Sequence, residues 1–310
     1  MRASHDAAFV FLGAFILLSQ NRCVLAQSSS PPAPAATLVG SKAPGEPSAV
    51  NSGALALEDA TSLLRVAVPK TLKNRQEAMA YTYQIDYRNR NFNQRGKLLV
   101  DYSAKYDVIF VGGLPYRRLT EENRKPLSPQ EAAAEESRYE RTFEQRSRMS
   151  IDQKRDYLKR PRNVDFPLPQ LADLFANRIV GEDLVDGRAA IVVESVPRVD
   201  VQPAGEEDRR ALHKQVKLWI DREDMIVSRI EATLVADDAA MKKGTRARID
   251  FVRKDGVYLP TESDVQFETM DGAQLVKGET EEQNQDFHKF HVDVRLLTPP
   301  DLAGDGHPAQ

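Results

Sequence analysis

Apolar and polar residues alternate along most of this chain, most clearly in "VKLWIDREDMIVSRIEATL", residues 216–234. Leu218 and Ile220 fall at a period of two before a charged turn, and Ile226 and Ile230 fall at the same period after it. This period is typical of β-strands with one apolar face and one hydrated face. The pattern therefore predicts a β-hairpin whose apolar face covers either an ordinary core or a ligand.

Similar short runs predict about ten strands in all. Asp-Gly pairs at 186–187, 255–256 and 271–272 are typical hairpin turns. The connections between the runs from 81 to 119 are too short for crossover helices, so these strands should form an antiparallel meander, and the later hairpins should continue it as one antiparallel sheet. The runs lie at 81–87, 98–102, 106–110, 116–119, from 184 to about 198, from 216 to 234, and from about 245 to 297.

Helical periodicity appears in a few places. An apolar stripe at 57–68 predicts a helix that Pro69 closes, and residues 169–178 predict a second, short one. Between the strands, 128–160 is a charged helical excursion that begins at Ser128 with a proline and a glutamate in capping positions. Its mixed charge favours a solvated helix over the alternative, a partner-docking arm.

A sheet of about ten strands must curl, close, or be covered on its apolar face. The few helical segments are the available cover. We therefore predict a mainly β fold with some α: a curled, unclosed antiparallel half-barrel with helices over its concave side, which leaves room for a ligand unless side chains fill it.

The N-terminus is typical of an exported protein. Arg2 precedes an apolar run at 7–18, and small residues end at Ala26, which predicts a signal peptide at 1–26 and a periplasmic location. The alternative is an uncleaved anchor. A Pro/Ser/Ala-rich linker (27–53), one folded domain (54–298) and a second disordered segment (299–310) should follow. Cleavage would remove Cys23, the single cysteine, so the core alone would hold the domain.

Composition narrows the possible partners. The chain has a formal net charge of −3, with basic and acidic residues mixed throughout, so nucleic acid is not an expected partner. The net charge gives no reason to expect attraction to anionic lipid either. We expect no enzyme, no cofactor and no metal, because recognised catalytic and phosphate-binding motifs are absent from the sequence.

Two histidines and the single tryptophan need separate interpretations. His288 and His291 are three residues apart on a predicted strand, so they point to opposite faces and cannot bind one ion together. We predict His288 to be a hydrogen-bonded core histidine and His291 to be hydrated. Trp219 faces away from Leu218, and we expect it to pack on the convex side of the sheet; the alternative is an exposed aromatic that binds a partner.

Several stretches resemble the LolA-like superfamily of exported lipoprotein carriers: "DFPLPQLADLF", "LWIDREDMIVSRIEA" and "GVYLPTESDVQFE", together with the Gly187-Arg188 turn. The resemblance covers roughly 57–297, and the 128–160 excursion departs from it. It implies an unclosed antiparallel half-barrel covered by helices, of a kind that binds acyl chains or acts as a periplasmic sensor.

Two functions from different classes follow. The first is a periplasmic binding protein that holds lipid or lipoprotein acyl chains on an apolar concave sheet surface. The second is an interaction or sensor module that docks on an envelope protein. For the first, the predicted lining residues are Tyr83, Ile85, Val100, Val108, Phe110, Leu218, Ile220, Ile226 and Ile230.

Overall fold

The computed structural model of the protein describes residues 57–159, 166–238, 241–272 and 274–290. The predicted signal peptide, linker and second disordered segment lie outside these residues, as does His291. Among the described residues, no helix is both long and apolar enough to cross a membrane.

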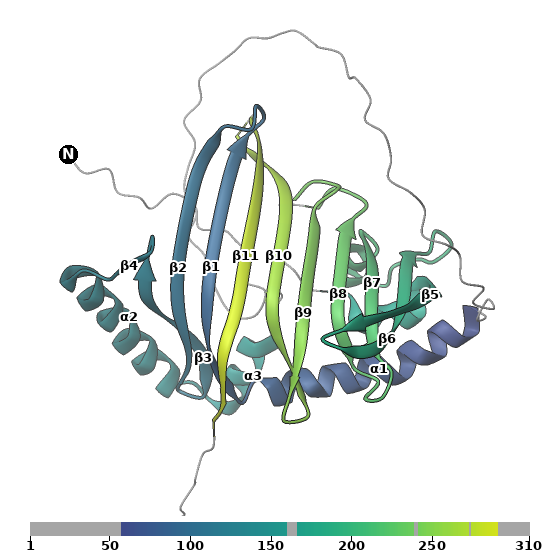
Figure 1. Ribbon diagram of the computed structural model, residues 1–310, viewed down its shortest axis with the longest axis horizontal. Helices are drawn as coiled ribbons and strands as arrows, with labels where there is room; N and C mark the ends of the chain where they lie inside the picture. Colours follow the sequence, from purple (N-terminus) through teal and green to yellow (C-terminus); the bar gives the residue numbers. More distant parts are fainter. Residues whose placement is uncertain (1–56, 160–165, 239–240, 273, 291–310) are drawn as a thin grey trace, which may run out of the picture.

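The described chain forms one antiparallel sheet of 11 strands in the order β4-β3-β2-β1-β11-β10-β9-β8-β7-β6-β5 (Figure 1). The last strand lies between the first and the tenth, and β4 and β5 are the two edges, so the sheet is curled but not closed. The predicted fold class is confirmed. The strands are β1 (Tyr81–Asn93), β2 (Leu98–Val111), β3 (Leu114–Glu122), β4 (Lys125–Pro126), β5 (Phe175–Val185), β6 (Arg188–Pro197), β7 (Lys214–Asp221), β8 (Val227–Leu234), β9 (Arg246–Lys254), β10 (Val257–Asp271) and β11 (Gln274–Lys289).

The longest helix, α1 (Leu57–Ala78), runs along the lower end of the sheet (Figure 1). The prediction that Pro69 ends this helix is wrong, because the buried face continues beyond it through Thr71 and Asn74. Asn74 donates to the backbone oxygen of Tyr258 and accepts from its backbone nitrogen, both at 2.8 Å. This packing outweighs the local cost of the proline.

The remaining helices are short or peripheral: α2 (Pro129–Ser147), α3 (Ile151–Lys159), η1 (Leu168–Gln170), α4 (Leu171–Leu174) and α5 (Glu206–Ala211). The helix predicted at 169–178 is therefore too long. It gives way to a strand at Phe175, which pairs with Pro197 of β6. From Phe175 onward the backbone N–H and C=O groups are satisfied by pairing with β6, in place of the hydrogen bonds of a further helical turn.

The hydrophobic core lies on one face of the sheet, which we call the inner face because α1 covers it. Most of this core is one cluster between α1, α4 and strands β5–β10, with Leu64 and Leu171 from the helices fully buried. A second cluster, around Tyr83, Ile85 and Val108, occupies the β1–β2 end of the same face. The sheet therefore has two apolar regions on its inner face.

The predicted helical excursion is two helices, α2 and α3, rather than one, and most of its residues are exposed. A few buried side chains fasten it to the sheet edge. Arg146 donates to the backbone oxygens of Leu114 and Pro115, at 3.0 Å each, and Glu135 accepts from Tyr116 Oη at 2.8 Å. The excursion is thus a hydrated arm with a specific attachment to β3.

We expect Arg146→Met to release this arm while leaving the sheet intact. The methionine fills similar space but cannot donate to the carbonyl groups at the start of β3, which would then lie unpaired. Brief trypsin treatment should cut the variant within 129–159 several times faster than the wild type, at unchanged circular dichroism in the β region. Arg141→Met, on the exposed side of α2, is the matched control; equal cleavage of both variants would contradict the attachment.

Two side-chain predictions have opposite outcomes. Trp219 is buried on the outer face with Val185, Ala190 and Val192, and its indole Nε1 donates to Asp183 at 2.9 Å, which confirms the convex packing. His288, however, is exposed, so its prediction as a core histidine is wrong. A β-bulge in β11 opposite the start of β1 turns Phe287 inward instead. One extra residue is enough to reverse the alternation.

Candidate functional site

The predicted lining residues fall into separate places. Leu218, Ile220 and Ile230 are fully buried in the large cluster under α1, and Ile226 lies partly buried just before β8. A bulge in β8 places Val227 opposite Ile220, so Val227 rather than Ser228 points to the inner face.

The other predicted residues lie at the β1–β2 end. Tyr83, Ile85 and Val108 belong to the second cluster, and Phe110 packs partly buried against Phe290, with ring centroids 5.5 Å apart. Val100 is 41% exposed at the far end of β2. The residues share one face of the sheet but not one continuous surface, so their role as a lining remains a prediction.

Between the two apolar clusters the inner face carries a strip of polar side chains. Antiparallel register places Tyr87 opposite Glu282 and Asn89 opposite Thr280. Arg117 of β3 and Asn284 of β11 belong to the same set. We call this set the inner polar strip, and its members are Tyr87, Asn89, Arg117, Thr280, Glu282 and Asn284. Every member is buried except Arg117, which is partly buried.

The centre of the strip is a buried ion pair. Arg117 of β3 reaches Glu282 of β11 with two parallel hydrogen bonds, Nη1 to Oε1 at 3.0 Å and Nη2 to Oε2 at 3.2 Å. The Glu282 side chain is 1% exposed and the Arg117 side chain 17%. Burial raises the pKa of Glu282, and Arg117 opposes that rise. Such a pair is expensive to bury, so it is weak evidence of added stability, and its place in the middle of an inner face makes it a candidate binding feature.

Tyrosines surround this pair. The Tyr87 ring meets those of Tyr102 and Tyr106 edge to face, with centroids 6.2 and 6.4 Å apart. Burial raises the pKa of all three phenols, so they stay protonated at neutral pH and can donate as well as accept hydrogen bonds. Their rings are apolar, so they join the strip to the second cluster.

Two amide oxygens in the strip lack partners. Within the described residues, Asn89 Oδ1 and Asn284 Oδ1 are buried and accept no hydrogen bond, although Asn284 Nδ2 donates to the Pro260 oxygen at 3.0 Å. Both residues are more than nine-tenths buried. Buried polar groups are nearly always satisfied, so these oxygens are positioned to receive a donor from a bound molecule or from water.

Sequence reasoning missed this strip because it searched for apolar faces. The signal was present in β11, "GETEEQNQDF", where the positions of both faces are polar although the strand lies inside the sheet. A central strand without an apolar face is unusual in a folded core. The register that aligns β11 with β1 and brings Arg117 to it could not be read from the sequence.

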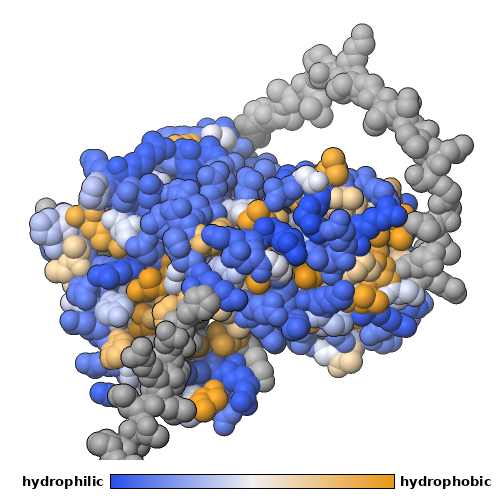
Figure 2. Space-filling view, turned by 60° about the horizontal axis from the view of Figure 1, so that its bottom comes forward, coloured by the Kyte–Doolittle hydropathy of each residue, from blue (hydrophilic) through white to orange (hydrophobic). Residues whose placement is uncertain are grey.

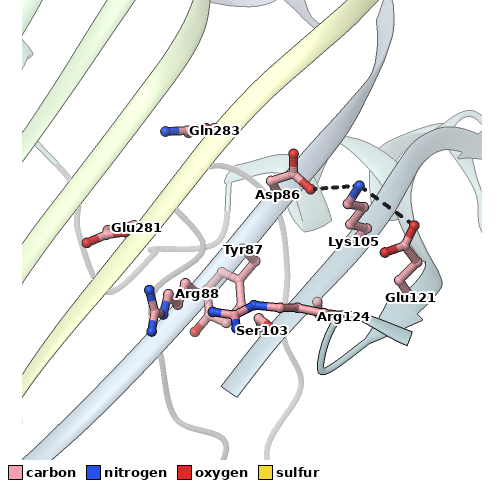
Figure 3. A pocket seen from close by; sticks show the side chains of 10 residues that line it. Asp86, Tyr87, Arg88, Ser103, Lys105, Glu121, Arg124, Glu281 and Gln283 are labelled. Atoms are coloured by element: carbon pink, nitrogen blue, oxygen red, sulfur yellow. Dashed lines mark ion pairs between the residues drawn. The ribbon is translucent and has the colours of Figure 1, made fainter. Parts of the chain in front are cut away.

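The outer face opposite the strip carries a shallow charged pocket of about 230 Å³ (Figure 3). Lys105 lies between Asp86 and Glu121, 3.7 Å from each carboxylate, and Arg88 forms a two-pronged pair with Asp101. These charges largely neutralise one another, so the pocket lacks a defined ligand charge. Among the described residues, no cluster of histidine, cysteine, aspartate or glutamate has the arrangement of a metal site.

Comparisons with known proteins add distant structural similarity. No family model and no curated protein matches the chain. A LolA superfamily protein from Nitrosomonas europaea is 11% identical, covering 75% of this chain and 94% of that one, with a TM-score of 0.29. The lipoprotein LppX from Mycobacterium tuberculosis is 11% identical, covering 75% and 98%, with a TM-score of 0.26. The MucA/MucB complex of Pseudomonas aeruginosa gives 11% identity, 73% and 94% coverage, and a TM-score of 0.23. One of these structures thus belongs to the LolA superfamily, which the sequence stretches resemble. The fold of this chain itself is the curled 11-stranded sheet and the helices described above.

Proposed function

We propose that the protein is an exported, periplasmic binding protein that holds lipid or lipoprotein acyl chains on the inner face of its sheet. The observation that carries this proposal is the inner polar strip, whose unpartnered amide oxygens lie between two apolar clusters. A molecule with an apolar chain and a polar group that donates hydrogen bonds matches this arrangement. Amide N–H and hydroxyl groups next to acyl chains are donors of this kind.

The apolar part of such a ligand supplies the affinity. Each methylene transferred from water to an apolar surface contributes about 0.8 kcal/mol, so about fifteen buried methylenes contribute about 12 kcal/mol. An association cost of about 4 kcal/mol then leaves about 8 kcal/mol, which corresponds to micromolar binding. The polar strip contributes orientation more than affinity, because its hydrogen bonds replace bonds to water. A ligand would reach it from the upper end of β1, where Asn91 is less buried than Asn89.

The direct test is uptake of a fluorescent N-acyl amide probe, whose amide N–H can donate to the strip, by the lipid-stripped exported protein, with native mass spectrometry of the unstripped protein alongside it. We expect saturable uptake in the micromolar range and a co-purifying lipid. Well-folded protein that takes up no probe at tens of micromolar and carries no lipid would overturn the proposal. The interaction module would then be the better interpretation.

A pair of asparagine variants separates binding from folding. Asn89→Leu removes an unsatisfied buried oxygen, so the variant should keep or slightly raise the melting temperature while probe uptake weakens by about tenfold. Asn74→Leu removes a side-chain amide that makes two hydrogen bonds to the backbone of Tyr258. It should therefore lower the free energy of unfolding by about 2–3 kcal/mol. Thermal denaturation and probe titration distinguish the two. Unchanged uptake in Asn89→Leu would remove the strip from the site.

A further inference from the structure

The upper ends of the tall strands carry an exposed apolar tip. Leu98, Leu99 and Val100 are 46%, 51% and 41% exposed, and Met270, in the neighbouring β10–β11 hairpin, is 47% exposed. The two hairpins lie side by side at the top of the sheet (Figure 1), because Asn93 of β1 pairs with Val276 of β11. We call Leu98, Leu99, Val100 and Met270 the strand tip.

Core packing does not explain this tip. Successive residues of a strand point to opposite faces, so three consecutive exposed apolar residues place hydrophobic surface on both sides of the hairpin. One of those faces would be polar in an ordinary hydrated hairpin. Other exposed apolar side chains lie away from the tip: Phe143 is on α2, Ile151 on α3 and Leu184 on β5, at the opposite edge of the sheet. The surface seen from the bottom is mostly hydrophilic with separate hydrophobic patches (Figure 2).

Basic side chains flank the tip. Arg95 and Lys97 lie in and beside the β1–β2 turn, both are exposed, and neither forms an ion pair within the described residues. Most other exposed arginines of the sheet are paired: Arg253 with Asp224 and Arg178 with Glu194, for example. The basic turn forms the end of the hairpin, and Leu98 begins β2 directly after it. A hairpin that lies obliquely on a bilayer with anionic headgroups therefore places the leucines in the interface, while the long side chains of Arg95 and Lys97 reach the phosphates beside them.

We propose that the strand tip docks the protein onto an anionic lipid bilayer, with Leu98 and Leu99 entering the interface and Arg95 and Lys97 at the headgroups. The net charge of the chain predicted no attraction to anionic lipid, but a bilayer meets only the tip. There these two cations outnumber the one exposed carboxylate that has no ion pair within the described residues, that of Asp271. The inference goes beyond the proposed function by naming the surface that would meet a membrane. It does not require an occupied inner face.

Vesicle flotation tests the docking directly. The exported protein is mixed with vesicles of phosphatidylcholine alone, or of phosphatidylcholine with about one-third phosphatidylglycerol. We expect binding to the anionic vesicles, weaker binding to the neutral ones, and loss of the difference at high salt. Leu98→Ser/Leu99→Ser should weaken binding at least about tenfold, and Arg95→Gln/Lys97→Gln about fivefold for each charge removed.

Matched controls place the effect at the tip. Val199→Ser removes a fully exposed apolar side chain elsewhere, and Arg141→Gln removes an exposed charge on α2; both should bind as the wild type does. Every variant keeps the same N-terminus, so the differences isolate the tip. Circular dichroism should be unchanged throughout, because the substituted side chains are about half exposed or more.

The outcomes are distinct. No binding by the wild type, or equal binding by the tip variants, overturns docking; so does gel filtration that shows a dimer which the serine variant dissolves, since the tip would then join two copies. Probe uptake in solution by the tip variants should equal that of the wild type. Vesicle binding without any probe uptake would keep the docking and remove the proposed function.

Discussion

Glu282→Ala is expected to lower the free energy of unfolding by about 3–5 kcal/mol, because it leaves the Arg117 guanidinium mostly buried without its carboxylate. The loss should appear in urea denaturation as a shifted midpoint with an unchanged slope. Glu281→Ala is the matched control: its side chain is 46% exposed and it pairs with Arg90 on the other face, so its loss should be about 1 kcal/mol or less.

The pair as a whole should contribute far less than this single variant indicates. Replacing both partners, as Arg117→Met with Glu282→Leu, should recover most of the lost stability, since two apolar side chains can fill the space without desolvating a charge. If the strip belongs to the ligand site, this double variant folds but takes up the acyl amide probe more weakly. A double variant as unstable as Glu282→Ala would show that the pair is a structural element of the sheet.

Asp221→Ala is expected to lower the free energy of unfolding by a similar amount, about 3–5 kcal/mol. The Asp221 carboxylate is 1% exposed and accepts from Arg188 Nε at 2.5 Å and Nη2 at 3.0 Å. It also accepts from the backbone nitrogens of Glu223 and Asp224, each at 2.9 Å, and so holds the β7–β8 turn. Glu223→Ala, which removes an exposed partner of the same arginine, should cost about 1 kcal/mol or less.

The same carboxylate should make stability dependent on pH. Burial alone would raise the pKa of Asp221, but the hydrogen bonds from Arg188 and the turn amides outweigh it and hold the pKa well below its usual range. A lowered folded-state pKa stabilises the protein above the unfolded value of about 4, and this stabilisation is lost as the pH falls through the folded value. Urea midpoints should therefore fall less between about pH 5 and pH 3 in Asp221→Asn than in the wild type. Equal acid sensitivity would contradict this assignment.

Arg188 and Asp221 also illustrate what a sequence motif means physically. Both lie in the stretches that resemble the LolA-like superfamily, the Gly187-Arg188 turn and the strand ending at Asp221. The structure joins them across the β6–β7 pair, where Ala190 lies opposite Asp221. These two residues therefore have a structural explanation: the buried Asp221 carboxylate holds the β7–β8 turn, and Arg188 is its charged partner. The motif identifies the fold without identifying a ligand.

Local alternation was sufficient for the fold class. Period-two runs, Asp-Gly turns and short connections determined an antiparallel sheet, and the shortage of helices determined that it curls with limited cover. The capping residues at Ser128 determined where α2 begins, and the structure contains the complete capping box. These features depend on residues close together in the chain, so the sequence contains the information that they need.

Only the tertiary structure decided the features that depend on distant partners. Pro69 lies inside α1 because Asn74 bonds Tyr258; His288 points outward because of a bulge against β1; and the polar strip exists because the register places Glu282 beside Tyr87 and within reach of Arg117. A shift of one residue in the register of β11 would have turned His288 and Glu282 to the opposite face. The sequence by itself determined that each strand has two faces, and the long-range pairing energy between strands decided which polar residues meet on the inner one.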